Sequence, residues 1–285
     1  MPLTRLLRVR AYLLSAGLAM AALSGCLTTP AKAQDLLQKI RQSGVLSIGT
    51  SNDAPLSYVQ GGDQAAGALP DILREFLKRE GINGRVEVTA MPFASLIPAI
   101  ESGRIGLIGD AMYIRPERQK LIDFTMVTFY NPESLDVAKG NPKNLHSLAD
   151  LCGHNAGTYE GTTYADLLKH TNASCPAGKA INIQLYPTIQ NVFADLAAGR
   201  LDAAVVDASL SAYALKQNPS LDFELVPDYR PLDKDTSGCA FGVAKGNSAF
   251  VDAFNKDYEA MKKDGTAAAI FTKWGLTPTA FFLNP

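Results

Sequence analysis

The feature that most constrains the fold is an alternation of short apolar runs with amphipathic segments, which starts near residue 45 and starts again near residue 153. In the first series, the spacing of apolar residues and the positions of Gly and Pro predict strands over residues 45–49, 85–90 and 105–109 and helices over residues 70–80 and 93–102. In the second series, they predict strands over residues 153–156, 181–186 and 201–206 and helices over residues 162–170 and 189–198. Alternating strands and helices form mainly parallel sheets flanked by helices, so the chain is predicted to be an α/β protein.

A weak internal repeat links the two series. Residues 97–110 (IPAIESGRIGLIGD) align with residues 193–207 (FADLAAGRLDAAVVD), and each segment reads as a helix, a Gly-Arg pair, a buried strand and an Asp near the strand end. Coincidence is one explanation, because helix–Gly–strand units are common. The other is a pair of similar lobes that present residues at their strand ends, where open parallel sheets bind ligands.

Composition excludes several classes of function. The 285 residues are 47% hydrophobic and 19% charged with a net charge of −1, so the chain can bury a core and is not disordered. Basic residues do not cluster outside the first ten positions, which argues against binding to nucleic acid. The three histidines (His146, His154 and His170) are isolated, and no phosphate-binding loop or nucleophile elbow occurs. We therefore expect neither a metal nor another cofactor.

The N-terminus has the pattern of an export signal. Three arginines lie among the first ten residues, and an almost wholly apolar stretch of small residues follows over residues 11–25. Residues 31–33 (AKA) form a signal-peptidase site, which predicts a signal peptide over residues 1–33. Residues 23–26 (LSGC) resemble a lipobox, and the alternative is lipid anchoring through Cys26. Both alternatives place the protein outside the cytoplasm.

Export affects how the cysteines are interpreted. Cys152 and Cys175 are 23 residues apart, and an oxidising compartment favours a disulfide between them. Such a bridge would stabilise the fold by about 3 kcal/mol. Two buried free thiols are the alternative, because sequence does not fix connectivity. Cys239 reads as a small strand residue without a function.

Six segments, in order, carry a resemblance to a known family. They are GVLSIGT (44–50) with APLSY (54–58), FASLIPAI (93–100), MYIRPERQ (112–119), EGTT (160–163), AGRLDA (198–203), and DGT to KWG (264–275). From about residue 36 to 278 the chain resembles the bacterial extracellular solute-binding proteins of family 3, the polar amino-acid receptors of ABC importers. The cysteine pair also resembles a subset of this family.

The resemblance implies a fold and a function. The fold is the two-lobed type II periplasmic-binding-protein fold, with lobe 1 at residues 34–131 and 240–285, lobe 2 at residues 132–239, and hinge crossings near 131–138 and 236–244. The function is that of a monomeric periplasmic receptor, which closes around a small amino-acid-like ligand and delivers it to the membrane subunits of an ABC importer.

By the same resemblance, Arg118 clamps the ligand carboxylate, a task that suits the planar guanidinium, although a solvated helix Arg would look the same in sequence. Thr162 and Thr163 open a helix whose backbone N–H groups make an anion seat, and an ordinary N-cap is compatible with that role. Asp207 takes the ligand ammonium, and its alternative is a cap on the following helix. Phe93 is either a wall that stacks on the ligand or a core residue. The remaining candidate ligand-binding residues are Asp53, Tyr58, Asp110, Met112, Tyr113 and Tyr159.

Three of these residues depart from the family pattern. Tyr113 stands where a Ser or Thr is common, Asp53 where many members have an aromatic residue, and Asp110 where a small residue is usual. With Asp207, the site would hold three acids (Asp53, Asp110 and Asp207) and one cation, Arg118. This excess of acids favours a ligand that is a basic amino acid or a cationic or zwitterionic derivative. The alternative function is an enzyme resembling the periplasmic cyclohexadienyl dehydratases, with Glu160 or Asp53 as the acid.

Overall fold

The structure, a computed structural model, describes residues 35–62, 64–231 and 237–276. The predicted signal peptide (1–33) and the lipobox cysteine lie outside the described residues. Among the helices within these ranges, none combines the length and the apolar character needed to cross a bilayer.

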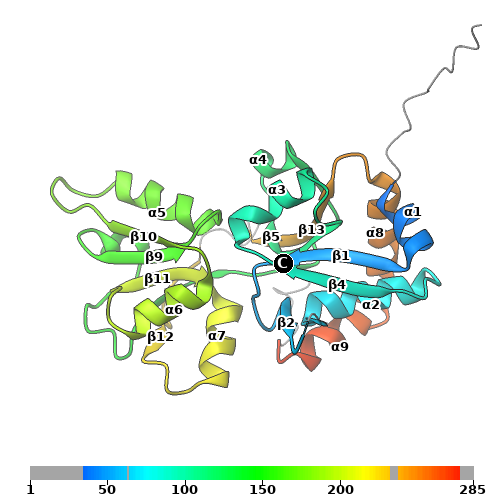
Figure 1. Cartoon of the computed structure of the whole chain (residues 1–285). Helices are drawn as coiled ribbons and strands as arrows, with labels where there is room; N and C mark the ends of the chain where they lie inside the picture. The colour runs from blue at the N-terminus through cyan, green and yellow to red at the C-terminus, as the bar shows by residue number, and fades with distance from the viewer. Residues whose placement is uncertain (1–34, 63, 232–236, 277–285) are drawn as a thin grey trace, which may run out of the picture. The chain divides into compact units, whose positions relative to one another are not determined.

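The strands form two sheets, and the first contains both early and late parts of the chain (Figure 1). Its order is β2-β3-β4-β1-β5-β13-β6, and β7 also pairs with β13. The strands are β1 (Val45–Thr50), β2 (Tyr58–Gln60), β3 (Gln64–Ala66), β4 (Arg85–Ala90), β5 (Leu107–Tyr113), β6 (Ile122–Phe124), β7 (Phe129–Tyr130) and β13 (Gly238–Ala244). Strand β1 runs parallel to β4 and β5, whereas β13 is antiparallel to β5.

The second sheet has the order β10-β9-β11-β8-β12. Its strands are β8 (Glu133–Ala138), β9 (Asn155–Tyr159), β10 (Asn182–Tyr186), β11 (Ala203–Asp207) and β12 (Phe223–Leu225). Strand β9 runs parallel to β10 and β11, and β8 is antiparallel to β11 and β12. The described sheets therefore confirm the α/β fold with two lobes. The expectation of mainly parallel sheets is wrong, because each sheet combines a parallel trio of strands with antiparallel neighbours.

The internal repeat corresponds to equivalent positions in the two sheets. The parallel trio β4-β1-β5 of the first sheet has the same order as the trio β10-β9-β11 of the second. Helix α3 (Leu96–Glu101) precedes β5 just as α6 (Ile189–Ala197) precedes β11. The matching order of elements supports the explanation by two similar lobes, and ligand binding at their strand ends stays a prediction.

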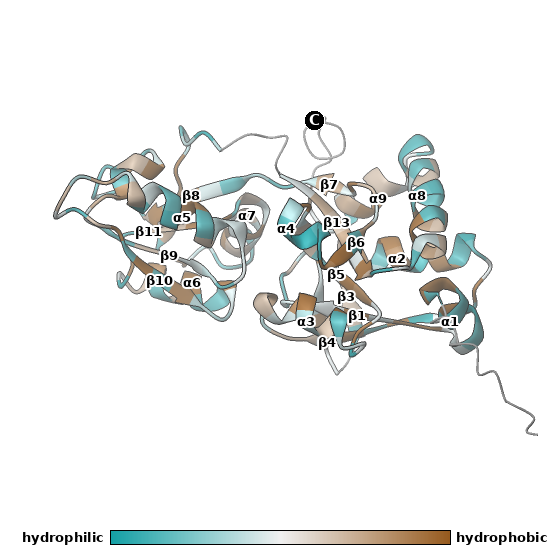
Figure 2. Ribbon diagram, turned by 90° about the horizontal axis from the view of Figure 1, so that it is seen from above, coloured by the Kyte–Doolittle hydropathy of each residue, from teal (hydrophilic) through white to brown (hydrophobic). Residues whose placement is uncertain are grey.

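Helices with one apolar face cover the sheets. Besides α3 and α6, the described helices are α1 (Leu36–Ser43), α2 (Ala68–Arg79), α4 (Pro116–Gln119), α5 (Thr163–Ala173), α7 (Ala208–Gln217), α8 (Ser248–Lys263) and α9 (Thr266–Lys273). Short 3₁₀ turns occur at η1 (Phe93–Ser95) and η2 (Leu148–Leu151). In α2 the buried residues recur every three or four positions, and Phe76 packs edge-on against Phe250 and Phe254 of α8. Figure 2 shows the hydrophobic colour on β5 and β13 in the middle of the first sheet, and mostly hydrophilic colour on α4.

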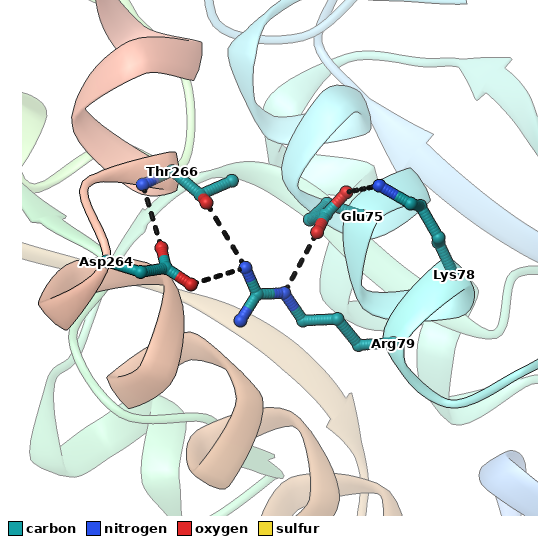
Figure 3. A network of polar contacts seen from close by, with 5 residues as sticks. All are labelled: Glu75, Lys78, Arg79, Asp264 and Thr266. Carbon is teal, nitrogen blue, oxygen red and sulfur yellow. Dashed lines mark hydrogen bonds and ion pairs between the residues drawn. The ribbon is translucent and has the colours of Figure 1, made fainter.

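A polar network joins the early helix α2 to the late helices α8 and α9 (Figure 3). Arg79 donates from Nε to Glu75 at 2.9 Å and from Nη2 to Asp264 at 2.8 Å and Thr266 at 3.2 Å. The side chain and the N–H of Thr266, together with the Arg79 guanidinium, lower the pKa of Asp264 to about 2. The network fixes the C-terminal helices on the first sheet's lobe.

Two segments connect the sheets. After β7 the chain passes directly into β8, and Asn131 N donates to Ser237 O at 3.0 Å just before β13 begins. Because β7 pairs with the start of β13, the outgoing and returning segments lie side by side. Sheet membership agrees with a discontinuous first lobe, and the residue boundaries given above stay a prediction.

The predicted disulfide is present. Cys152 and Cys175 are bonded with a Cα–Cα distance of 5.5 Å, and Cys239 is a buried free thiol in β13. The bridge ties the segment after η2 to the end of α5 and closes a 23-residue separation.

We expect reduction of this disulfide to lower the free energy of unfolding by about 3 kcal/mol, because the unfolded chain regains the entropy of the open loop. Melting curves of the mature chain with and without dithiothreitol measure this, and the Tm should fall by roughly 10 °C. The control is the double variant Cys152→Ala/Cys175→Ala, which should melt at the lower temperature in both buffers. Equal Tm values for this variant and the oxidised wild type would contradict the prediction.

Candidate functional site

Side chains from both sheets surround one small cavity of about 10 Å³. The residues that line it are Phe93, Ala111, Tyr113, Arg118, Tyr159, Thr162, Thr163, Tyr164 and Asp207. Phe93, Ala111, Tyr113 and Arg118 belong to elements of the first sheet's lobe, and the others to the second. A space of this size holds about one water molecule. The lining residues therefore fill the position between the lobes almost completely.

Arg118 is the only cation that lines this cavity among the described residues. It lies in the single-turn helix α4, which begins at Pro116, and it is 8% exposed. Its Nη1 donates to Tyr113 O at 2.9 Å and its Nη2 to Gly161 O at 3.0 Å. The guanidinium also lies 5.5 Å from the centre of the Phe93 ring. Burial lowers the pKa of Arg118, yet an arginine remains charged. The alternative of a solvated Arg is wrong for this residue.

Gly161 allows the two lobes to approach at this point. Its φ is +78°, and a Cβ there would lie 2.8 Å from Ala94 Cα and 2.9 Å from Ala94 Cβ. A larger residue would be strained by the backbone conformation and would collide with the η1 turn. The glycine carbonyl can therefore reach Arg118 of the opposite lobe.

Thr162 is an N-cap residue, as one interpretation of the sequence expected. Its Oγ1 accepts from Ala165 N at 3.4 Å in the first turn of α5 and donates to Tyr159 O at 2.8 Å. Thr163 follows as the first residue of the helix and also lines the cavity. The anion seat at this helix start stays a prediction.

Asp207 ends β11 and is 2% exposed. It occupies the N-cap position of α7, but its side chain makes no capping bond, so the capping alternative for this carboxyl is wrong. Its carboxyl instead accepts from Tyr159 OH at 2.6 Å, Tyr164 OH at 2.7 Å and Asn131 Nδ2 at 2.7 Å. Burial raises the pKa of Asp207 to about 6, against the two tyrosine donors that lower it.

Tyr113 belongs to the same cluster. Its hydroxyl donates to Asn131 O and lies 2.8 Å from the hydroxyl of Tyr164. Burial, together with the nearby Asp207, raises the pKa of both tyrosines, which therefore stay neutral donors. The phenol of Tyr113 thus reaches toward the carboxyl of Asp207, while only its backbone carbonyl contacts Arg118.

Asp53 and Asp110 meet at Ser51 rather than in the cavity. Ser51 Oγ lies 2.5 Å from Asp53 Oδ2 and 2.6 Å from Asp110 Oδ2, and Ser51 N donates to Asp110 Oδ2 at 2.5 Å. Both aspartates are at most 2% exposed. Burial raises the pKa of each carboxyl, and for Asp53 the charge of Asp110 adds to the effect.

Two other predicted pocket residues lie outside the cavity. Tyr58 is in the edge strand β2 and packs edge-on against Trp274 at 6.0 Å. Met112 alternates with Ala111 and Tyr113 along β5, so its side chain points to the opposite side and lies in the hydrophobic core. Phe93 fits both of its interpretations, because it is a core residue that also lines the cavity.

Sequence reasoning missed Ser51, Asn131 and Tyr164. Tyr164 follows the two threonines in the first turn of α5, a position from which a side chain can reach the same site. Asn131 lies where the chain passes between the sheets, and only the topology brings it to Asp207. Within the described ranges, no group of three or more His, Cys, Asp or Glu residues could hold a metal ion.

We expect Tyr159→Phe and Tyr164→Phe each to raise the pKa of Asp207 above about 6, by about one unit, because each removes a donor to the charged carboxylate. The pKa is measured by ¹³C NMR of aspartate-labelled protein, with the signal assigned through Asp207→Asn. Since the folded pKa exceeds the unfolded value, the stability that Asp207 contributes is present at low pH. It is lost as the pH rises through about 6, and this loss should move to higher pH in both variants.

Tyr58→Phe serves as the control and should leave the titration of Asp207 unchanged, because Tyr58 packs against Trp274 instead. An unchanged or lowered midpoint in both cavity variants would contradict the hydrogen bonds described above.

Comparison with known proteins agrees with this geometry. The sequence profile of the bacterial extracellular solute-binding proteins, family 3, matches residues 46–277. The histidine-binding periplasmic protein of Salmonella typhimurium is 30% identical over 83% of this chain and 87% of that protein. The L-cystine-binding protein TcyJ of Escherichia coli is 26% identical over 90% and 92%. The structure of an ancestral arginine-binding protein bound to arginine superposes with a TM-score of 0.72 and 30% identity, covering 81% of this chain and 98% of that one. The chain therefore belongs to the bacterial extracellular solute-binding proteins, family 3, and has their two-lobed type II fold.

Proposed function

We propose that this protein is a periplasmic receptor that captures a small amino-acid-like zwitterion and delivers it to the membrane subunits of an ABC importer. The observation that carries the proposal is the pair of opposite charges on one cavity: Arg118 comes from the first sheet's lobe and Asp207 from the second. Each is buried, and a zwitterion carries a group that suits each of them. Export through the N-terminal signal, with the mature chain starting after residue 33, is part of this proposal.

Binding would replace protein partners by ligand partners. The carboxylate of the ligand would take the guanidinium donors that Tyr113 O and Gly161 O now accept, and its ammonium would approach the Asp207 carboxyl. A cavity of about 10 Å³ admits no amino acid, so the lobes must separate before a ligand enters. Closure at the paired segments near Asn131 and Ser237 would then complete both contacts.

The ligand we propose is a basic amino acid or a cationic amino-acid derivative. Asp207, Asp53 and Asp110 are three buried acids near the site, and Arg118 is the one cation lining the cavity in the described structure. Relatives whose names specify histidine and arginine support the basic class, whereas a relative named for cystine shows that the family's ligands vary. The three buried acids of this chain favour a basic ligand over cystine.

We propose binding without catalysis. Of the two residues considered for a dehydratase-like acid, Glu160 is exposed at the end of β9, and Asp53 is held against Ser51 outside the cavity. The relatives described above are binding proteins by name. Incubation with prephenate or arogenate should therefore give no change in product absorbance, and product formation at enzyme concentration would overturn this part of the proposal.

We expect arginine, lysine or ornithine to raise the Tm of the mature protein, and Arg118→Lys to weaken that binding about 10- to 100-fold. A lysine cannot replace the two parallel N–H donors of a guanidinium. Thermal-shift titration and calorimetry measure the effect. The matched control is Arg115→Lys, which makes the same change three residues away and should keep the affinity of the wild type.

Two outcomes would contradict the proposal. If Arg118→Lys binds these ligands with the affinity of the wild type, Arg118 does not clamp the ligand carboxylate. A large thermal shift with aspartate or glutamate, and none with arginine, lysine, ornithine or betaine-like compounds, would reject the cationic ligand class. Native mass spectrometry of the purified mature chain would identify a ligand that remains bound during purification.

A further inference from the structure

The contact of two buried carboxyls with one hydroxyl requires an additional proton. Ser51 Oγ lies 2.5 Å from Asp53 Oδ2 and 2.6 Å from Asp110 Oδ2, and both are hydrogen-bond distances. A serine hydroxyl has one proton and can donate to only one of the two oxygens. The other carboxyl must therefore donate to Ser51, and it can do so only as a neutral acid.

The hydrogen bonds show which carboxyl carries this proton. Asp110 accepts from Ser51 N at 2.5 Å, from Ala111 N at 2.8 Å and, weakly, from Thr50 Oγ1 at 3.4 Å, which is the environment of a carboxylate. Asp53 has the Ser51 contact alone, and its Oδ1 is buried without a hydrogen-bond partner in the described structure. A neutral carboxyl tolerates an unpartnered oxygen better than a charged one does, so the proton belongs on Asp53.

The surrounding charges favour the same assignment. Besides burial, the negative charges of Asp110 in β5 and of Asp207 at the end of β11 both raise the pKa of Asp53. Besides burial, Asp53 and Asp110 in turn raise the pKa of the hydroxyl of Tyr159, a residue of the cavity wall. No Lys, Arg or His within the described ranges forms an ion pair with Asp53 or Asp110. The pair therefore has excess negative charge and no bound cation to balance it.

The loop that carries Ser51 and Asp53 faces the second lobe. Gln190 of α6 donates from Nε2 to Asn52 O at 3.0 Å, so this loop contacts the lobe that holds Asp207. A ligand held between Arg118 and Asp207 would thus have the Ser51 loop as a neighbour. The unpartnered Oδ1 of Asp53 offers an acceptor there.

We propose that Ser51, Asp53 and Asp110 form a second subsite, in which Asp53 carries one proton in the ligand-free protein and exchanges it for an ammonium or guanidinium group of the ligand. The inference rests on the proposed receptor function and names the group that determines specificity. As the cationic group arrives, Asp53 releases its proton to the solvent, and both of its oxygens accept N–H donors. Asp110 stays ionised throughout, so one positive charge replaces another and the net charge of the subsite is the same before and after binding.

The proton itself is tested without a ligand. We expect ¹³C NMR of aspartate-labelled protein at about pH 7 to show Asp53 as a neutral carboxyl, its signal identified by its loss in Asp53→Asn. Asp136→Asn is the matched control: Asp136 is also buried, accepts from serine side chains (Ser211 Oγ at 2.5 Å, and Ser134) and has an unpartnered oxygen, but it lies in β8. This control should remove a different signal, with a midpoint at about pH 7, and leave that of Asp53 unchanged. An ionised Asp53 at pH 7 would overturn the proposal.

The exchange is tested with L-arginine as the probe and L-glutamine as its neutral counterpart. Calorimetry in two buffers of different ionisation enthalpy should show about one proton released per arginine bound and none per glutamine, and the arginine affinity should rise with pH while Asp53 titrates. Asp53→Asn should abolish the release and weaken arginine binding about 10-fold. Asp53→Ser is a second variant in case the first does not fold.

The outcomes separate the two proposals. Arginine binding without proton release, glutamine binding with no arginine binding, or unchanged arginine affinity in Asp53→Asn would overturn the subsite and leave the receptor function intact. A protein that binds no amino acid or amino-acid derivative would fail the receptor function itself. In that case the subsite falls with it, whatever the state of Asp53.

Discussion

The site depends on the burial of opposite charges on opposite lobes. A buried charge is costly unless it is paired or hydrogen-bonded, and here no direct ion pair joins Arg118 to Asp207 among the described contacts. Backbone carbonyls satisfy the guanidinium, while two phenols and an amide satisfy the carboxyl. One of these bonds, from Arg118 to Gly161, crosses between the lobes. The protein therefore supplies, from its own groups, partners that a zwitterionic ligand would replace.

Local patterns in the sequence predicted the framework of this arrangement. Apolar patterns predicted the parallel strands β1, β4 and β5 of the first sheet and β9, β10 and β11 of the second, but not the antiparallel strands beside them. The Gly-Arg repeat located equivalent strands whose ends carry functional candidates. Arg118 and Asp207 came from a family resemblance, and the structure places both on one cavity. The disulfide followed from export and spacing, and Cys152 and Cys175 are bonded. These features depend on neighbours close in sequence or on a motif of a few residues.

The parts that sequence reasoning missed depend on contacts between distant elements. Tyr164 and Asn131 reach Asp207 only because α5 and the segment after β7 meet at the end of β11. Met112 was expected in the pocket, but strand alternation turns it into the core. Asp53 and Asp110 looked like two separate pocket acids in the sequence, since nothing local indicates that Ser51 brings them together. The proton that we propose on Asp53 follows from this contact and not from any local pattern in the sequence.

The contact between Gly161 and Ala94 sets a limit on the closed state. A Cβ on residue 161 would lie 2.8 Å from Ala94 Cα, so only glycine lets the lobes approach this closely, and no change of rotamer could relieve the overlap. Any larger residue at position 161 would hold the lobes farther apart, whereas substitutions in the other walls of the cavity would change its lining and leave this limit in place.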